Sequence, residues 1–208
     1  MDEWAVIFGL HVSIYWLSVA LFKDAATPAK DFKTACAASL KNQIFHALPV
    51  TYVFFQGVKN WYPGYHGERL SFYDSLPYLP LQALTTDCYF HIMHRIMHTK
   101  LFWSFHRKHH DAKTHVAKAL DGDMLEHIFV NLFSVFFGVW VLQYFFGILL
   151  DSSILYIWCA ISNIAVMQSH RSKEGGKNPG RHERHHIFVK CNYGVGLYAL
   201  DRLTGTFR

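Results

Sequence analysis

The chain has 208 residues, a length that suits a single domain. Hydrophobic residues make up 51% and charged residues only 17%, against about 25% charged in soluble domains, so an ordinary soluble protein is excluded. The net charge is +5, but the sequence has no basic, aromatic-interleaved nucleic-acid motif, and we expect no nucleic-acid partner. The four cysteines lie far apart and include no Cys-x-x-Cys pair, which indicates reduced thiols rather than disulfides or a zinc knuckle.

The first apolar stretch, residues 4–22, is long enough to cross a membrane. At about 1.5 Å per residue, a helix of this length nearly matches a bilayer core of about 30 Å. Asp2 and Glu3 precede it in place of a basic segment, which favours a retained anchor helix over a cleaved signal peptide. A polar connector is expected from Lys23 to Lys41.

Two weaker apolar segments follow. Residues 43–58 are short and contain Pro49, which predicts a kinked spanning helix. Residues 59–75 suit an interfacial loop, because they combine glycine, proline and several aromatic residues. Residues 76–93 are interrupted by prolines and an aspartate, so they either span the membrane or lie at its surface.

The strongest spanning signal is residues 128–150, and residues 154–168 form another apolar run after Asp151-Ser-Ser. One helix of this combined length would exceed any bilayer, so a tight helical hairpin is expected. Two crossings return the chain to the membrane face it left. The sequence therefore predicts an all-α membrane protein of about four transmembrane helices, with a helical cap on one face.

Basic residues are distributed very unequally between the two faces. If residues 76–93 span the membrane, one face carries 18 lysines and arginines and the other carries 2. If this segment lies in the interface instead, the counts are 16 and 4. Both versions place the cap in the cytoplasm by the positive-inside rule.

Three histidine boxes lie outside the apolar runs, on the segments that this topology brings to one face. The first has His-x-x-x-His spacing and the other two have His-x-x-His-His spacing, so the imidazoles of each box share one helix face. A single such pair arises easily by chance, but three boxes do not suit a set of solvated surface histidines. The boxes contain His94, His98, His106, His109, His110, His182, His185 and His186.

Imidazole is the commonest transition-metal ligand in proteins. All-nitrogen ligation argues against calcium and magnesium, which prefer oxygen. Eight histidines also exceed the four ligands of one tetrahedral zinc ion. The boxes therefore indicate two metal ions.

The boxes and their flanks resemble the fatty acid hydroxylase/sterol desaturase superfamily of integral-membrane di-iron oxygenases. Asp87 and Phe90 are similar to the family's Asp-x-x-aromatic lead-in to the first box. Asn192-Tyr-Gly and the stretch Asp201–Thr206 resemble its C-terminal motifs, although Leu203-Thr204 replaces the usual Leu-Phe. The resemblance covers about residues 80–208, which would form the catalytic region of one membrane domain behind the anchor helices of residues 1–75.

The resemblance implies nine iron ligands, because a single histidine precedes the family's last box. They are His94, His98, His106, His109, His110, His170, His182, His185 and His186. Asp87, Asp111, Glu183 and Asp201 are candidates for orienting these ligands.

Other histidines and one motif are less clear. His91 stands where the family has an aromatic residue, so an orienting or packing role is favoured over ligation. Packing or an interhelical hydrogen bond is favoured for His11 and His46. Asp123-Met-Leu-Glu126 occupies the place of the family's His-Pro-x-Glu, which puts that motif's role in doubt and leaves His127 unassigned.

The implied function is an O2-dependent hydroxylation or desaturation of a lipid at two Fe ions. A sterol or sterol precursor is slightly favoured, followed by a fatty acyl or sphingolipid chain, with a carotenoid less favoured. Electrons would come from cytochrome b5 with its NAD(P)H reductase, or from a ferredoxin. Basic residues Arg107, Lys108, Lys113 and Arg181 would dock an acidic donor or meet anionic lipid. The expected location is the endoplasmic reticulum or a bacterial inner membrane.

Two other classes of function are open. A histidine-rich membrane metal transporter or metal-binding protein would place metal-binding residues within its apolar spans, whereas here the boxes lie outside them. A catalytically inactive scaffold is the other alternative, and the complete boxes argue against it.

Overall fold

A computed structural model of the chain describes residues 2–22, 29–61, 67–110, 115–171 and 180–208. Every regular element in these ranges is helical, which confirms the all-α class for them. The longer elements are α1 (Glu3–Phe22), α2 (Ala29–Asn42), α3 (Leu48–Trp61), α5 (Leu79–Met97), α7 (Phe133–Phe146) and α8 (Ser152–Ser169). The shorter elements are η1 (Gln43–Ala47), α4 (Phe72–Ser75), η3 (Leu76–Tyr78), α6 (Trp103–His110), η4 (Val116–Leu120), η5 (Glu126–Leu132), α9 (Arg181–Phe188) and α10 (Ala199–Thr204).

Three helices in the described ranges are long and apolar enough to cross a bilayer: α1, the joined η5–α7 helix and α8. Only 28–33% of their apolar windows is buried inside the protein. Large apolar side chains such as Leu17, Phe145 and Ile161 remain exposed on them, as expected of a lipid-facing surface. These helices match three of the predicted spans and mark an integral membrane protein. A fourth span, over residues 43–58 or 76–93, stays a prediction.

The predicted polar connector is helical over most of its length, because residues 29–42 form α2. This helix continues through η1 into α3 as one helical run to residue 61. Its buried Ala35 and its half-buried Phe32 and Cys36 pack against the protein core. One apolar face therefore stabilises this helix, although the mean hydropathy of the stretch is low. Pro49 would clash with the carbonyl group of Phe45, and the π-helical turn of η1 lies at that point.

The two prolines of the third apolar segment begin a helix rather than interrupt one. Pro77 lies in the single 3-10 turn of η3, and Pro80 is at the start of α5. Proline is tolerated at these positions because the first N–H groups of a helix have no partner within it. α5 then runs without a break from residue 79 to residue 97, directly into the first histidine box.

The predicted hairpin between the last two apolar runs is confirmed. α7 ends at Phe146, where Gly147 adopts a left-handed φ of 65°, so the helix stops four residues earlier than expected. Asp151 caps α8 by accepting a hydrogen bond of 2.8 Å from the backbone of Ser153.

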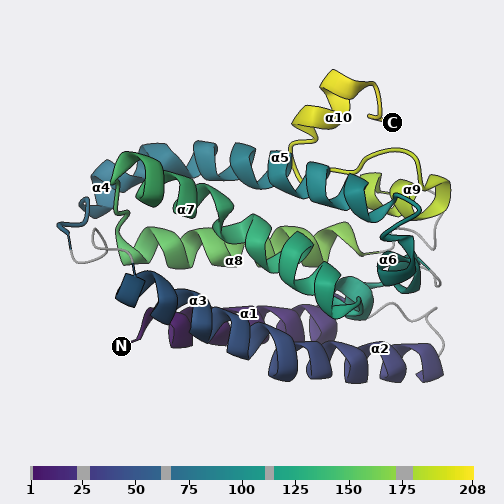
Figure 1. The fold of residues 1–208 in the computed structure, drawn as a ribbon. Coiled ribbons are helices and arrows are strands. Elements are labelled where there is room, and N and C mark those ends of the chain that lie inside the picture. The colour runs from purple at the N-terminus through teal and green to yellow at the C-terminus, as the bar shows by residue number, and fades with distance from the viewer. Residues whose placement is uncertain (1, 23–28, 62–66, 111–114, 172–179) are drawn as a thin grey trace.

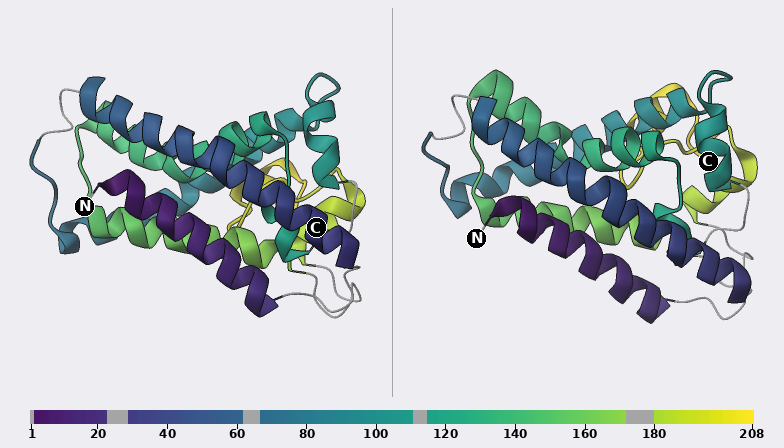
Figure 2. Two further views of the ribbon diagram at one scale, coloured as in Figure 1. Left: turned by 90° about the horizontal axis from the view of Figure 1, so that it is seen from below. Right: turned by 60° about the horizontal axis from the view of Figure 1, so that its bottom comes forward.

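The long helices lie roughly along one direction, and the histidine boxes gather at one end of the bundle. In Figure 1, α5 and α7 lie above α8, while α1 and α2–α3 lie below it. α6 and α9 meet beside the C-terminal end of α5. The two views of Figure 2 show α1 and the α2–α3 run crossing the opposite face of the molecule. The hairpin thus brings the third box to the first two, as the order of crossings predicts.

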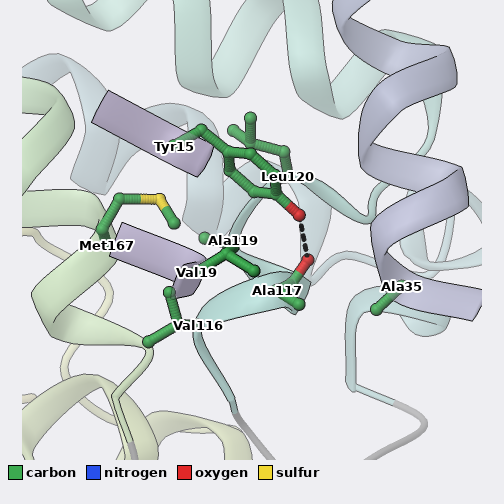
Figure 3. Packing of buried hydrophobic residues seen from close by; sticks show 8 residues of the cluster. All are labelled: Tyr15, Val19, Ala35, Val116, Ala117, Ala119, Leu120 and Met167. Atoms are coloured by element: carbon green, nitrogen blue, oxygen red, sulfur yellow. Dashed lines mark hydrogen bonds between the residues drawn. The ribbon is translucent and has the colours of Figure 1, made fainter. Parts of the chain in front are cut away.

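The short helix η4 packs against the N-terminal helices, and Figure 3 shows its apolar side chains beside Tyr15, Val19 and Ala35. Tyr15 donates a hydrogen bond of 2.9 Å to the carbonyl oxygen of Ala117, and Ser39 donates one of 3.0 Å to the same oxygen. The side-chain amide of Asn42 donates to the carbonyl oxygen of Leu120 at 2.6 Å. The N-terminal helices therefore hold the segment that leads from α6 to the spanning helix η5–α7.

Candidate metal centre

Four helices supply the histidines of the site. α5 carries His94, and His98 caps its C-terminus. His170 caps the C-terminus of α8 in the same way. α6 and α9 are single eight-residue helices, and each presents three histidines on one face by its i, i+3, i+4 spacing.

Five of these imidazoles form one group, here called the five-histidine cluster. It consists of His94, His98, His106, His110 and His185. The Nε2 atom of His106 lies 3.0 Å from that of His94 and 2.9 Å from that of His110. The Nε2 atoms of His98 and His185 lie 3.0 Å apart.

The remaining four form the four-histidine cluster. It consists of His109, His170, His182 and His186. The Nε2 atom of His170 lies 3.1 Å from that of His109 and 3.1 Å from that of His182. The Nε2 atom of His186 is also 3.1 Å from that of His182. The two clusters are adjacent, since the rings of His109 and His106 are 5.5 Å apart between centroids.

In three of the clustered histidines, the hydrogen bond of Nδ1 shows that the converging Nε2 atom carries a lone pair. His94 donates its Nδ1 proton to the carbonyl oxygen of Tyr193 at 2.8 Å, and His185 donates to that of Cys191 at 2.7 Å. His170 donates to the carbonyl oxygen of Val166 at 3.0 Å. A neutral imidazole has one N–H, so each of these bonds leaves Nε2 as an acceptor. Converging lone pairs repel one another unless a cation lies between them.

The donor set fits a bound metal ion in each cluster. A metal–nitrogen bond of about 2.1 Å places ligands at right angles about 3.0 Å apart, and tetrahedral ligands about 3.4 Å apart. The Nε2 separations of 2.9–3.1 Å agree with the first arrangement. All-imidazole ligation suits a transition metal.

Burial favours the neutral, metal-binding form of the clustered histidines whose pKa it lowers. Desolvation lowers the pKa of both His170 and His185 to about 4, although each ring donates a hydrogen bond to a backbone carbonyl group. The pKa of His109 is held well below its usual range by burial and then by its neighbours, of which His170 is the strongest. Metal binding therefore requires no deprotonation at neutral pH.

One carboxylate contacts both clusters. The Oε2 atom of Glu126 lies 3.2 Å from Nδ1 of His106, and its Oε1 atom lies 3.9 Å from Nδ1 of His109. Glu126 is only 3% exposed. Carboxylates beside metal-binding histidines fix the orientation of the ring and raise its basicity. The sequence left the role of the motif that contains Glu126 in doubt. Only the position of this motif after the second box indicated that Glu126 could lie near the histidines.

The four predicted orienting acids have different outcomes. Asp87 accepts hydrogen bonds from the backbone N–H groups of Val195, Tyr198 and Ala199 at 2.8–3.1 Å, and so fixes the C-terminal loop rather than a histidine of the clusters. Glu183 accepts a hydrogen bond from the backbone of Gly180 at the start of α9. Asp111 lies outside the described residues.

Asp201 acts on the site through one intermediate residue. Its carboxylate accepts hydrogen bonds from the backbone of Tyr193 at 2.9 Å and of Gly194 at 2.7 Å. Burial raises its pKa, but these bonds and that from Thr206 outweigh burial and lower the pKa below its ordinary value. Tyr193 in turn offers its carbonyl oxygen to His94. The two C-terminal motifs thus support the first box.

Three other histidines that the sequence analysis named lie outside both clusters. His91 contacts Asp201, with Nδ1 and Oδ2 3.2 Å apart, in agreement with the favoured orienting role. His11 and Asn163 form an interhelical hydrogen bond of 2.7 Å, as expected. His46 packs near His127, with ring centroids 6.2 Å apart.

Comparison with known proteins places this site in a family. The Fatty acid hydroxylase family model matches residues 79–206. The Homo sapiens protein called "Fatty acid hydroxylase domain-containing protein 2" is 28% identical over 171 residues, which cover 80% of this chain. The Macaca fascicularis protein of the same name is 27% identical over the same length.

The match is limited in two ways. The chain spans about half the length of the curated relatives it matches, since the aligned residues cover 49% of each. No solved structure shows a significant match to this chain. The family model nevertheless covers more than half of the chain and includes all nine clustered histidines, so the chain belongs to the fatty acid hydroxylase family.

Proposed function

We propose that the chain is a membrane-bound oxygenase that hydroxylates or desaturates a lipid at two iron ions. The observation that carries this proposal is the pair of adjacent all-histidine clusters, one of five and one of four converging Nε2 atoms. Five nitrogen ligands exceed tetrahedral zinc, and calcium and magnesium prefer oxygen. The family match supports an oxidoreductase acting on lipid.

The protein residues of this site have three tasks in the proposed reaction. The nine histidines would hold the two ions, which supply the chemistry of O2 activation and C–H oxidation. Glu126 and the backbone acceptors at Tyr193 and Cys191 hold the imidazoles in place. Buried apolar side chains, including Phe90 and Val130, line the site and limit the entry of water.

An apolar cavity of about 160 Å³ supports a lipid substrate. It lies between α5, α7, α8 and the C-terminal loop, and exposed Ile161 and Leu197 stand on its wall. Phe90, Val166 and Val195 line both this cavity and the metal site. A lipid entering from the bilayer would therefore reach the metals from this side. A sterol or sterol precursor is our first candidate, and a fatty acyl or sphingolipid chain is the second.

Electrons would enter from the opposite side of the site. A hollow of about 380 Å³, lined by His98, Lys100, Trp103 and Val189, reaches the five-histidine cluster from the surface. Arg107 is exposed nearby on α6. Cytochrome b5 with its NAD(P)H reductase, or a ferredoxin, is the proposed donor, because an acidic surface would complement these basic residues.

The positive-inside rule assigns this end of the bundle to the cytosol, in the endoplasmic reticulum or a bacterial inner membrane. Lys108 is paired with Asp121 at 2.8 Å, and the Arg181 guanidinium stacks on Phe207, so these two predicted docking residues have contacts within the chain. Lys113 lies outside the described residues.

The proposal is tested by metal content and by turnover. Protein purified from iron-replete cells should contain two iron atoms per chain and form an oxidised lipid only with O2 and a reductant. His109→Ala and His185→Ala remove one ligand from each cluster, so both should abolish product formation. His46→Ala, which alters a histidine outside the clusters, is the control. Full lipid oxidation by both cluster variants would refute the proposal.

The same experiment separates the enzyme from a metal transporter or storage protein. A transporter would bind metal without forming an O2-dependent product, and its metal-binding residues would follow the spanning helices. Here none of the nine clustered histidines lies within the three described candidate spans. Lipidomics of cells lacking the protein would then identify the precursor that accumulates.

A further inference from the structure

A small chamber with mostly apolar walls and a few buried polar side chains lies inside the bundle, apart from both histidine clusters. It has a volume of about 40 Å³ and is formed by α1, α3, η5, α7 and α8. His11, His127 and Ser162 lie on its wall, and their exposed fractions are 7%, 0% and 7%. These side chains come from three helices that cross or adjoin the apolar part of the protein.

The chamber contains hydrogen-bonding atoms without protein partners. These atoms are Nε2 of His11, both ring nitrogens of His127 and Oγ of Ser162, none of which has a hydrogen-bond partner among the described residues. Nδ1 of His11 is already bonded to Asn163. Buried polar atoms in folded proteins nearly always have a partner. Four unpartnered atoms on the side chains that line one chamber therefore indicate a site for a polar group from outside the chain.

The chamber adjoins the proposed route of the substrate. Asn131, Val135, Ser162 and Val166 line both the chamber and the apolar cavity of about 160 Å³. Asn131 and Val166 also line the metal site. A volume of about 40 Å³ admits a hydroxyl group or a few water molecules, but not a lipid chain. The body of a lipid would thus occupy the apolar cavity, with its polar group in the chamber.

The chemistry of the wall selects the kind of polar group. None of the described residues that line the chamber is a lysine, arginine, aspartate or glutamate. A carboxylate or phosphate would therefore be buried without a counter-charge, which is strongly unfavourable. A hydroxyl group can donate to one imidazole nitrogen and accept from an imidazole N–H or from Ser162, so it matches the unpartnered atoms.

We propose that this chamber binds the hydroxyl group of an uncharged lipid and so positions the lipid's carbon skeleton beside the metal site. The inference rests on the proposed function, since it assigns a substrate class to that site. It makes Ser162 and His127 positioning and specificity residues rather than catalytic ones.

The test is lipid binding by the full-length, iron-loaded protein in nanodiscs under anaerobic conditions, where no turnover occurs. The probes are hexadecan-1-ol and cholesterol, each compared with its methyl ether, together with hexadecanoate. At least one alcohol should bind ten times more tightly than its ether, and hexadecanoate should bind no better than the ethers. Equal affinities of alcohol and ether, or the absence of binding by every probe, would overturn the proposal and leave the chamber filled by water.

A pair of serine variants locates the effect. Ser162→Ala should reduce the preference for the alcohol to less than threefold and leave the affinity for the ether unchanged. Ser18→Ala is the matched control, because Ser18 is also 7% exposed on a spanning helix but lines neither the chamber nor the apolar cavity. An unchanged preference in Ser162→Ala would refute the assignment. If a variant does not fold, the comparison of alcohol and ether binding by the unaltered protein still tests the proposed hydroxyl site.

The chamber and the proposed function can fail separately. Iron content and O2-dependent product formation are measured on the same preparations. A protein that prefers the alcohol but forms no oxidised product contradicts only the proposed function. A protein that oxidises lipid but binds alcohol and ether equally contradicts only the hydroxyl site.

Discussion

His94 donates its Nδ1 proton to the carbonyl oxygen of Tyr193 across 99 positions of sequence, at a distance of 2.8 Å. The first histidine box is therefore oriented by the C-terminal loop, which two buried carboxylates hold beside α5. Asp87 fixes the loop at Val195, Tyr198 and Ala199, and Asp201 fixes it at Tyr193 and Gly194.

Replacement of Asp201 tests this support. In Asp201→Asn, the amide NH2 group replaces one carboxylate oxygen and faces a backbone N–H group that had donated a hydrogen bond to it. Buried hydrogen bonds are therefore lost. We expect a loss of stability of about 2–4 kcal/mol and a lower iron content, because Tyr193 no longer fixes His94. Thermal unfolding and metal analysis of the detergent-solubilised protein measure both. Exposed Asp74→Asn is the control, and equal behaviour of the two variants would contradict the role of Asp201.

Replacement of Glu126 tests the link between the two clusters. In Glu126→Gln the side chain loses its charge and no longer presents an oxygen to both His106 and His109. We expect the iron affinity of each cluster to fall about 10–100-fold. Titration against a competing chelator measures this, with half-buried Asp123→Asn as the control three residues away. A fall confined to one cluster would show that Glu126 orients only one histidine.

The shared faces of the eight box histidines were predictable because their spacing acts locally, whereas His170 was expected only from the family resemblance. An i, i+3, i+4 pattern fixes the shared face of α6 and of α9 whatever the rest of the chain does. The hairpin between α7 and α8 was predictable from length alone, and it implied that His182 would meet His106. The partners of the Nδ1 atoms were not predictable, because they are mostly backbone carbonyl groups set by long-range packing.

Two features of the fold were not predicted, each for its own physical reason. Mean hydropathy identified α1, α7 and α8, which expose apolar surface, but it does not detect a helix with only one apolar face. α2 is such a helix, and its apolar side is buried against η4. The prolines of residues 76–93 suggest interruptions, whereas Pro77 and Pro80 lie in the first turns of η3 and α5, where proline is tolerated.

Gly194 shows how closely the C-terminal loop packs on the two carboxylates. A Cβ atom at this position would lie 2.9 Å from Oδ2 of Asp201 and 3.1 Å from Oδ1 of Asp87. Gly194→Ala should therefore destabilise the protein by about 1–3 kcal/mol. Gly9→Ala is the control, because a Cβ atom there meets nothing within 4 Å and alanine favours the helix. Thermal unfolding compares them, and equal melting temperatures would contradict the close packing.

The carbonyl oxygen of Ala117 provides the sharpest test of how the N-terminal helices support the site. Tyr15 and Ser39 both donate to this buried oxygen, so either single variant leaves it one partner. Tyr15→Phe and Ser39→Ala should each cost about 0.5–1.5 kcal/mol. The double variant leaves the oxygen without either donor, so its cost should exceed the sum of the single costs by about 0.5–3 kcal/mol. A double-mutant cycle of unfolding free energies measures this excess, and Thr34→Ala on the exposed face of α2 is the control. Strict additivity would mean that the two hydroxyl groups act independently and that η4 is held by apolar packing instead.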